Sequence, residues 1–329
     1  MNHVNIILAT YNGERYIKEQ IDSILNNSFT SWRLWIFDDG STDKTSSIIE
    51  GYVQLYPNKI MFHRNKKNLG VTLNFLNGIH STANDYVDMR DMGSDKTVNG
   101  NTEQNTEYYM FCDQDDVWME DKIEKTLKHM NNVEKKYGTD TAIAVFTDAL
   151  VVDDKLNKLY SSFYKESNLD TNKVDLPHIM MENKLIGCTV MFNNELQKRM
   201  KTLPIHARYH DWWIAMIAAA FGYISYLPET TLSYRQHSNN LVGNMNFLSY
   251  VKDRITSIEK QKQSLHNIIL QAEEFYQIYH TQLLQKERKQ VYILAHLEKE
   301  NWIIRRFLLL KYGYWKTGIL RNIGLLWLV

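Results

Sequence analysis

Three carboxylates lie within four positions of the segment YYMFCDQDDVW, residues 108–118: they belong to Asp113, Asp115 and Asp116. Like charges this close repel one another unless a cation lies among them or water surrounds them. Mg²⁺ and Mn²⁺ prefer oxygen ligands, and they commonly take one or two protein carboxylates while substrate phosphates supply further oxygens. The cluster therefore indicates either a divalent-cation site for a phosphorylated ligand or a wide, solvated turn.

The flanking residues predict the elements that carry this cluster. Residues 108–112 form an apolar, aromatic run typical of a buried strand, and Ile123, Leu127 and Met130 recur at helical spacing behind it. A D-x-D pattern alone is a weak signal, because carboxylates are common in turns. Its position between a strand and an amphipathic helix strengthens the interpretation as a metal site.

Other segments of the chain have the same order of elements. Helical patterns alternate with short apolar runs, for which we predict strands at residues 4–9, 32–37, 60–63, 108–112 and 142–146. Strands that alternate with helices predict an α/β fold with a mostly parallel sheet flanked by helices on both faces. In such sheets ligands bind beyond the carboxyl ends of the strands.

Polar loops follow the first, second and fourth predicted strands. They are TYN at residues 10–12, DDGS at 38–41 and DQDD at 113–116. Because the carboxyl ends of neighbouring parallel strands lie at the same edge of a sheet, we expect the three loops to converge on one crevice.

Composition narrows the class of protein. The 329 residues are 44% hydrophobic with a formal net charge of zero, so we expect a folded protein that does not bind nucleic acid. Two cysteines in apolar surroundings favour a reducing compartment. We find no pattern of a signal peptide or membrane-spanning helix, and therefore expect a cytoplasmic location.

One polar stretch interrupts the alternation. Residues 85–107 are rich in Asn, Asp, Thr and Gly and lack a steady period, so we interpret them as an inserted loop. Asp88, Asp91 and Asp95 could suggest a calcium site, but their spacing does not match an EF-hand, and a solvated loop is favoured.

The chain changes character after residue 245. We predict a catalytic domain over residues 1–245 and a helical C-terminal region over 246–329. Residues 301–329 contain five basic residues and no acidic ones, together with many aromatic and aliphatic residues. This composition suits an amphipathic segment on an anionic membrane surface. The alternative is a helix that packs its apolar side on the rest of the protein.

Several motifs together resemble glycosyltransferase family 2. They are VNIILATYNGERYIKEQIDSIL, LWIFDDGSTDKT, NLGVTLNF, MFCDQDDVWMEDKI, HDWWIAMIA and YRQHSNN, within residues 3–245. The resemblance implies the GT-A fold, a Rossmann-like sheet that binds nucleotide-diphosphate sugars. FCDQDDVW, HDWW and YRQHSNN are similar to bacterial rhamnosyltransferases of cell-wall and O-antigen polysaccharide assembly.

The resemblance assigns donor-binding roles to the first two loops. Thr10, Tyr11 and Glu14 are expected to hold the nucleotide, with Tyr11 against the base. Asp39 is expected to accept a hydrogen bond from the pyrimidine imide, while Asp38 supports the loop. The alternative for the second loop is a capped turn without a ligand.

Further positions of the motifs match metal and phosphate contacts of the family. Asn68 is expected near the base or ribose, and Asp113 near the ribose or the metal. Asp115 and His237 are expected to bind the Mn²⁺ or Mg²⁺ ion that bridges the donor diphosphate, and Arg235 to offset its charge. For Asn68 a plain turn is the alternative, and for His237 a purely structural role.

The carboxylate of HDWW corresponds to the catalytic base of the family. Asp211 is expected to deprotonate the acceptor hydroxyl in a single inverting displacement. Its alternative role is to cap the helix that follows, and the two roles are compatible. His210 stands where many relatives have an acid. Cys188, in the stretch expected to border the sugar, is interpreted as a packing residue.

The resulting hypothesis is an inverting, metal-dependent glycosyltransferase that moves L-rhamnose from dTDP-L-rhamnose to a cell-surface polysaccharide or lipid-linked glycan. A UDP-hexose or UDP-galactofuranose donor would leave every motif intact. A non-catalytic sugar-nucleotide-binding protein would not need Asp211. A nucleotidyltransferase should have a glycine-rich, basic phosphate loop after the first strand, which ATYNGERY is not.

Overall fold

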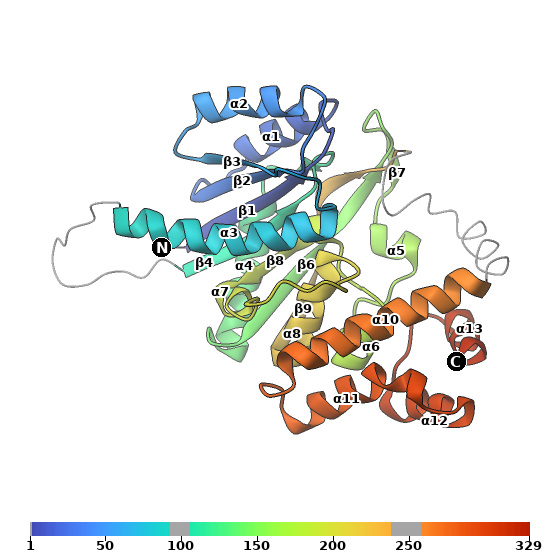
Figure 1. The fold of residues 1–329 in the computed structure, drawn as a ribbon. Coiled ribbons are helices and arrows are strands. Elements are labelled where there is room, and N and C mark those ends of the chain that lie inside the picture. Colours follow the sequence, from blue (N-terminus) through green and yellow to red (C-terminus); the bar gives the residue numbers. More distant parts are fainter. Residues whose placement is uncertain (1, 93–105, 238–257) are drawn as a thin grey trace.

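The computed structural model describes residues 2–92, 106–237 and 258–329, with the backbone alone for residues 83–92 (Figure 1). These residues form an α/β fold around one nine-stranded sheet of order β3-β2-β1-β4-β8-β6-β9-β5, with β7 beside β6. The predicted fold class is confirmed, and the sheet is mostly parallel in the half that precedes residue 113.

The first half of the sheet contains the strands predicted from the apolar runs. The strands β3 (Ile60–Arg64), β2 (Trp32–Asp38), β1 (Asn2–Thr10) and β4 (Thr106–Cys112) pair in parallel. Every residue of β1 from Val4 onward is buried, because helices cover both faces of the sheet. The carboxyl ends of β1, β2 and β4 therefore lie at one edge.

The second half of the sheet mixes directions. It contains β5 (Val117–Trp118), β6 (Ala142–Val152), β7 (Lys158–Tyr160), β8 (Val190–Asn193) and β9 (Gly222–Arg235). β8 pairs antiparallel with both β4 and β6, whereas β9 is parallel to β6 and antiparallel to β5. The antiparallel strand β8 joins the two halves into one sheet.

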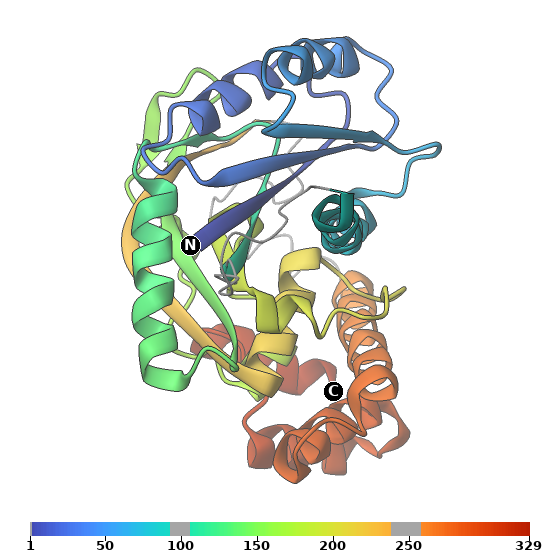
Figure 2. The same ribbon diagram turned by 90° about the vertical axis from the view of Figure 1, so that its left-hand side faces the viewer.

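Amphipathic helices cover the sheet as their apolar spacing predicts. The helices α1 (Ile17–Leu25) and α2 (Thr45–Leu55) lie on one face of β1–β3, and α3 (Val71–Met92) lies on the other (Figures 1 and 2). Further helices are α4 (Lys122–Tyr137), α5 (Phe163–Ser167), α6 (Leu176–Met181), α7 (Asn194–Gln197) and α8 (His210–Phe221), with a 3₁₀ turn, η1, at Gly187–Thr189.

The loop prediction for residues 85–107 is wrong at both ends. Helix α3 continues to Met92, and β4 begins at Thr106. Once the packed turns around Phe75 and Ile79 have formed, each added helical residue needs only its own backbone hydrogen bond, so a polar, aperiodic sequence can continue the helix. Residues 93–105, which include Asp95, lie outside the described residues.

Four helices follow the sheet domain. They are α10 (Ile258–Tyr279), α11 (Gln285–Ala295), α12 (Trp302–Tyr312) and α13 (Ile319–Leu328), with a 3₁₀ turn, η2, at Leu297–Lys299. They form one end of the molecule, remote from α1 and α2 (Figures 1 and 2). The predicted boundary between residues 245 and 246 falls outside the described residues. Within the described part of the chain, no helix is both long and apolar enough to cross a membrane.

Candidate active site

The carboxyl ends of β1, β2 and β4 and the start of α8 surround one cavity of about 410 Å³. It brings together residues that are more than 200 positions apart in the sequence. Seven of the eleven residues expected to bind donor or metal, or to act as base, line it: Thr10, Tyr11, Asp39, Asn68, Asp113, Asp115 and Asp211. The expected base, Asp211, and the carboxylate turn at residues 113–116 therefore share one cavity. Glu14, Asp38, Arg235 and His237 are not among its lining residues.

Asp38 supports the second loop through hydrogen bonds to Ser41 and Ser46. Its fully buried carboxylate accepts hydrogen bonds from the backbone N–H of Ser41 at 2.9 Å and from the hydroxyl groups of Ser41 and Ser46 at 2.5 and 2.6 Å. These contacts occupy the side chain that was expected among the donor-binding residues. Its position agrees with the supporting role rather than with direct contact to a ligand.

Asp39 connects the second loop to the NLG segment. Its carboxylate accepts backbone N–H groups of Leu69 and Gly70, both at 2.8 Å, and the side-chain amide of Asn65 at 2.9 Å. Asn68 donates to the backbone carbonyl of Asp39 at 3.2 Å. Gly70 has φ +79°, a conformation that favours glycine. The two segments thus form one rigid wall of the cavity.

Glu14 joins the first loop to the start of α2. Its carboxylate accepts the backbone N–H of Lys44 at 2.9 Å, and its own N–H donates to Asp43 at 3.1 Å. Asp43 also accepts the backbone N–H of Thr45, the first residue of α2. Glu14 therefore positions the loop that carries Tyr11.

Gln114 is a site residue that the sequence analysis did not assign. Its side-chain carbonyl accepts the Thr10 hydroxyl at 2.6 Å and the Tyr11 N–H at 2.9 Å, and its amide donates to the Tyr11 carbonyl at 3.3 Å. A Cβ atom at Gly13 would approach Gln114 Oε1 to 2.3 Å. Gln114 lies between the two aspartates of D-x-D, a position that could have drawn attention to it.

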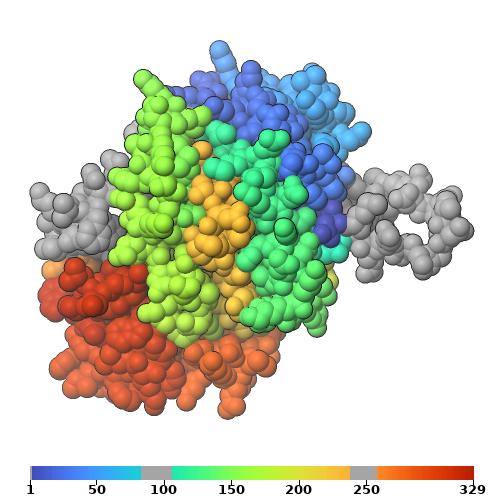
Figure 3. All heavy atoms as spheres, turned by 180° about the vertical axis from the view of Figure 1, so that it is seen from behind, coloured from blue at the N-terminus to red at the C-terminus, as the bar shows by residue number. Residues whose placement is uncertain are grey.

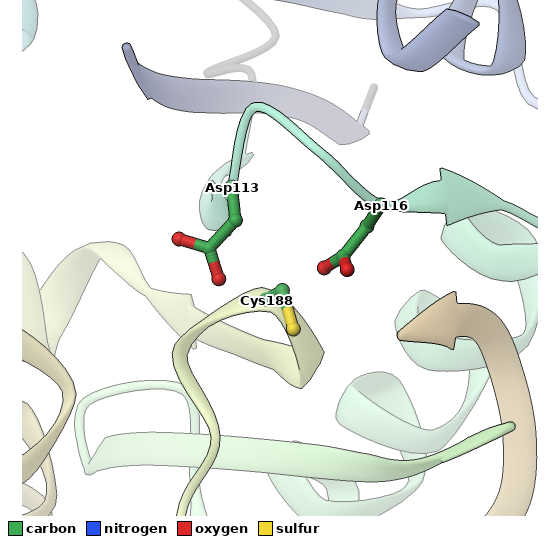
Figure 4. A group of neighbouring side chains, drawn as sticks. All are labelled: Asp113, Asp116 and Cys188. Carbon is green, nitrogen blue, oxygen red and sulfur yellow. The ribbon is translucent and has the colours of Figure 1, made fainter. Parts of the chain in front are cut away.

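The carboxylate turn contains two groups of possible ligands. His237 Nε2 lies 2.7 Å from a carboxylate oxygen of Asp115. Asp113 and Asp116 point toward Cys188, and the ligand atoms of these three residues lie within 4.8 Å of one another (Figure 4).

The buried carboxylates of the turn repel one another. Burial, and then repulsion by Asp116, Asp115 and Asp211, raises the pKa of Asp113 well above its ordinary value. Burial and the neighbouring Asp115 raise the pKa of Asp116 to about 7. Oδ2 of Asp116 has no hydrogen-bond partner among the described residues. A divalent cation would relieve this repulsion, so the residues present fit a metal site.

The chemistry of the donors favours Asp113 and Asp115 over Cys188 as metal ligands. Burial raises the pKa of the Cys188 thiol well above its usual range, so the thiol stays protonated. A protonated thiol is a poor ligand for Mg²⁺ or Mn²⁺, which prefer oxygen. Asp113 and Asp115 line the cavity, whereas Asp116 and Cys188 do not. The interpretation of Cys188 as a packing residue agrees with its burial.

Arg235 holds the turn instead of lining the cavity. Its buried guanidinium donates to the carbonyls of Asp115 at 2.7 Å and Asp154 at 2.6 Å and pairs with Glu19. Its backbone N–H donates to Asp116 at 3.1 Å. These contacts occupy the guanidinium that the sequence analysis expected beside a diphosphate. The motif alone does not show that Glu19 and Asp154 lie next to Arg235.

Asp211 is the second residue of α8, and Tyr209 is the N-cap. One carboxylate oxygen accepts the side-chain amide of Asn183 at 2.9 Å and the backbone N–H of Trp212 at 2.7 Å. Burial raises the pKa of Asp211 to about 7 despite these hydrogen bonds. The carboxylate thus contacts the first turn of the helix and also lines the cavity.

His210 lines the cavity and packs against aromatic rings. Its ring stacks on Phe75 with centroids 3.9 Å apart and meets Phe111 edge-on. Burial lowers its pKa to about 3, so the ring is neutral. A Cβ atom at Gly187 would lie 2.6 Å from His210 Nε2, which explains a glycine there. The neutral ring packs under the helix start that carries Asp211.

Comparisons with known proteins agree with this geometry. Residues 5–91 match the family described as "Glycosyl transferase family 2". The chain is 28% identical over 254 residues to the dTDP-rhamnosyl transferase RfbG of Shigella flexneri, covering 74% of this chain and 77% of that protein. It is 23% identical to the putative teichuronic acid biosynthesis glycosyltransferase TuaG of Bacillus subtilis (strain 168), covering 73% and 82%.

A solved structure shares the fold. The S. aureus protein TarS, residues 1–349 in complex with UDP-GlcNAc, superposes with a TM-score of 0.53 at 16% sequence identity, covering 93% of this chain and 83% of that chain. At this identity the likeness concerns the fold. Sequence match and sheet agree: residues 5–91 form part of a glycosyltransferase family 2 domain, and the described residues have a GT-A fold.

Proposed function

We propose that this protein transfers a sugar from a nucleotide-diphosphate donor to a hydroxyl group of a glycan, with inversion at the anomeric carbon. The carrying observation is the shared cavity of Asp211 and the turn with Asp113 and Asp115. One wall suits a metal-bound diphosphate, and the other presents a carboxylate that can accept a proton. Transfer of a glycosyl group to a hydroxyl needs both functions.

Asp113, Asp115 and His237 would hold Mn²⁺ or Mg²⁺. The ion would neutralise the charge that develops on the departing diphosphate. Other residues of the cavity would bind the nucleotide. Asp39 and Asn68 shape the wall beside it, and the half-exposed Tyr11 is free to stack on its base.

Asp211 would act as the base. A group with a pKa of about 7 exchanges protons readily at neutral pH, as general-base catalysis requires. In the inverting step the acceptor oxygen forms a bond to the anomeric carbon. The bond between that carbon and the diphosphate oxygen breaks. The acceptor proton passes to Asp211, and the nucleoside diphosphate leaves.

The donor is proposed to be dTDP-L-rhamnose, and the acceptor a cell-surface polysaccharide or a lipid-linked glycan. The name of the relative RfbG supports the donor, and that of TuaG supports a polysaccharide product. The alternative is a UDP-hexose or UDP-galactofuranose, because the TarS structure that shares this fold is a complex with UDP-GlcNAc. A binding protein without catalysis would not need Asp211 in the cavity.

A panel of nucleotide sugars tests this proposal. With Mn²⁺ present, dTDP-L-rhamnose should raise the melting temperature more than UDP-glucose, UDP-GlcNAc or UDP-galactofuranose, because ligand binding stabilises the folded state. The same panel without metal should give little change. Stabilisation by a UDP-sugar alone would establish the alternative donor, and no response to any sugar nucleotide would contradict the proposed function.

We also propose that the C-terminal helices place the enzyme on an anionic membrane surface at the cytoplasmic face. Nine of the twenty large apolar side chains that are exposed in the described residues lie between Trp302 and Trp327. All the well-exposed side chains of α13 are apolar: they belong to Ile319, Leu320, Ile323 and Trp327. Only a few residues of this segment, such as Leu309 and Leu325, are buried against the body.

The charge of this segment favours a lipid surface over a protein partner. Residues 301–329 have no acidic side chain, and the exposed Lys311 borders the apolar side of α12. Apolar and aromatic residues beside basic ones suit the boundary between anionic headgroups and acyl chains. Each large apolar side chain contributes about 1.5–3 kcal/mol when fully buried.

Vesicle sedimentation tests the membrane proposal. We expect binding to vesicles of phosphatidylcholine with phosphatidylglycerol and weak binding to phosphatidylcholine alone. The variant with Ile319→Ser, Ile323→Ser and Trp327→Ser should stay in the supernatant. Its matched control replaces equally exposed residues elsewhere and should bind as wild type: Leu55→Ser, Ile205→Ser and Leu284→Ser. A wild-type dimer that the α13 variant dissociates would instead assign this face to a second copy.

A further inference from the structure

The segment before α13 and its first turn contact the loop that borders the active site. From behind, the C-terminal segment lies against the part of the chain between β6 and α6 (Figure 3). Arg321 donates to the Glu182 carboxylate at 2.9 Å and to the Ser167 carbonyl at 3.1 Å. The backbone N–H of Thr317 donates to Glu182 at 2.7 Å. Two residues near the C-terminus thus hold one carboxylate.

A buried lysine completes this contact. The Lys184 ammonium, whose side chain is 1% exposed, donates to the Glu182 carboxylate and to the Thr317 hydroxyl. The Thr317 hydroxyl also accepts the backbone N–H of Asp170 at 3.2 Å. Because Glu182, Lys184 and Arg321 are largely shielded from water, their attraction is stronger than that of a surface ion pair.

Asn183, which lies between two residues held by the C-terminal segment, contacts the expected base Asp211. Asn183 lies between Glu182 and Lys184, and its amide nitrogen donates to Asp211 at 2.9 Å. Its amide oxygen accepts the backbone N–H of Leu185 at 3.1 Å, which orients the amide. The loop then continues to Ile186 and Gly187, which line the cavity.

We infer that Thr317 and Arg321 are positioning residues of the active site: they hold the loop at residues 182–187 so that Asn183 orients the carboxylate of Asp211. The inference rests on the proposed role of Asp211 as base. It makes the C-terminal segment part of the catalytic apparatus, in addition to its proposed contact with a membrane. The separation of 110 residues between Asp211 and Arg321 conceals this connection in the sequence.

The inference predicts a change in the titration of Asp211. An amide that donates to a carboxylate stabilises its charged form, so loss of the Asn183 contact should raise the pKa of Asp211 further. The titratable groups near this carboxylate are Asp113, whose charge opposes ionisation of Asp211, and His210, which is neutral. Neither contacts Arg321 in the described structure, so Arg321→Gln should act through the loop.

Two variants and a matched control test the inference in the full-length protein. Asn183→Ala and Arg321→Gln should each lower kcat about tenfold or more, because small misplacements of a catalytic group are costly. Donor affinity with Mn²⁺ should remain unchanged. Arg305→Gln is the control, since Arg305 lies in the same segment but donates only to the carbonyls of Glu298 and Glu300. Arg321→Lys keeps the charge beside Glu182 and should recover most of the activity.

A spectroscopic readout separates positioning from loss of stability. The carboxyl carbon of Asp211, assigned by NMR with Asp211→Asn, should titrate about half a unit to one unit higher in Asn183→Ala and Arg321→Gln. An Arg321→Gln protein with the kcat and titration of Arg305→Gln would overturn the inference. If the titration shifts as expected while the wild type transfers no sugar from any donor, the positioning holds and the proposed function fails.

Discussion

The two walls of the cavity are held by different kinds of contact. On the donor side, Asp38, Asp39 and Gln114 are bound by groups within the first 114 residues, through hydrogen bonds between adjacent loops of one parallel sheet. On the acceptor side, Asp211 depends on Asn183, whose loop is held by Thr317 and Arg321.

In the proposed function, this difference separates recognition of the nucleotide from control of the acceptor. The donor wall is complete within the sheet domain, and residues 5–91, which match the family, supply much of it. The proposed acceptor wall is contacted through Glu182 by Thr317 and Arg321 of the C-terminal segment, whose outer face is apolar and basic. Variants of the donor wall should therefore change donor binding, and variants of the acceptor wall should change turnover.

The largest effect is expected at the base. Asp211→Asn keeps the shape of the side chain but removes the proton acceptor, so kcat should fall about 100- to 10,000-fold. Donor affinity by calorimetry should stay near the wild-type value. Asp140→Asn, at an exposed position, is the control. Near-wild-type turnover in Asp211→Asn would remove Asp211 as the base.

A metal ligand should affect binding before turnover. Asp115→Ala removes an expected ligand of the ion, and calorimetry with Mn²⁺ should show donor affinity at least about tenfold weaker. Glu120→Ala, an exposed acid just beyond the turn, should behave as wild type. Unchanged Mn²⁺-dependent affinity in Asp115→Ala would refute the ligand role.

The pH dependence should follow the base. As the proposed base, Asp211 would be active when ionised, and burial raises its pKa to about 7. With saturating metal, kcat/KM should therefore rise about tenfold per unit below pH 7 and level off above it. The residual activity of Asp211→Asn should lack this rise. A wild-type profile that is flat between pH 5 and 8 would show that another group accepts the proton.

The smallest effect is expected at the link between the first loop and the carboxylate turn. Gln114→Ala removes three hydrogen bonds and leaves Tyr11 less constrained, so the free energy of unfolding should fall by about 1–3 kcal/mol. Donor affinity should weaken modestly. Chemical denaturation measures the first effect, with the exposed Gln54→Ala as control. Equal stability of the two variants would show that the link is not needed.

Local patterns identified much of the fold and part of the site. Apolar runs located the strands of the parallel half, because a strand buried on both faces has a continuous apolar sequence. The apolar runs did not show β8 or β9 as strands. Both strands pair with β6, and the sequence pattern does not show these pairings. The end of α3 was misplaced because polar residues can extend a packed helix.

The motifs identified residues of the cavity, but they did not predict which groups each residue contacts. Asp39, Asp113, Asp115 and Asp211 do line one cavity. Arg235 was expected beside the diphosphate, but in the structure it holds the turn, because Glu19 and two carbonyls occupy its guanidinium. Residue type shows what a side chain can bind, and its neighbours in space determine what it does bind.

By itself, the sequence determined the class of fold, the polar strand ends and the basic, apolar character of the C-terminal segment, since these follow from local periodicity and composition. The tertiary structure alone decided that Gln114 joins two loops, that Arg235 supports the turn and that residues 317 and 321 reach the loop beside Asp211. These contacts join positions 104 to 139 residues apart, and no local pattern encodes which distant groups will meet when the chain packs.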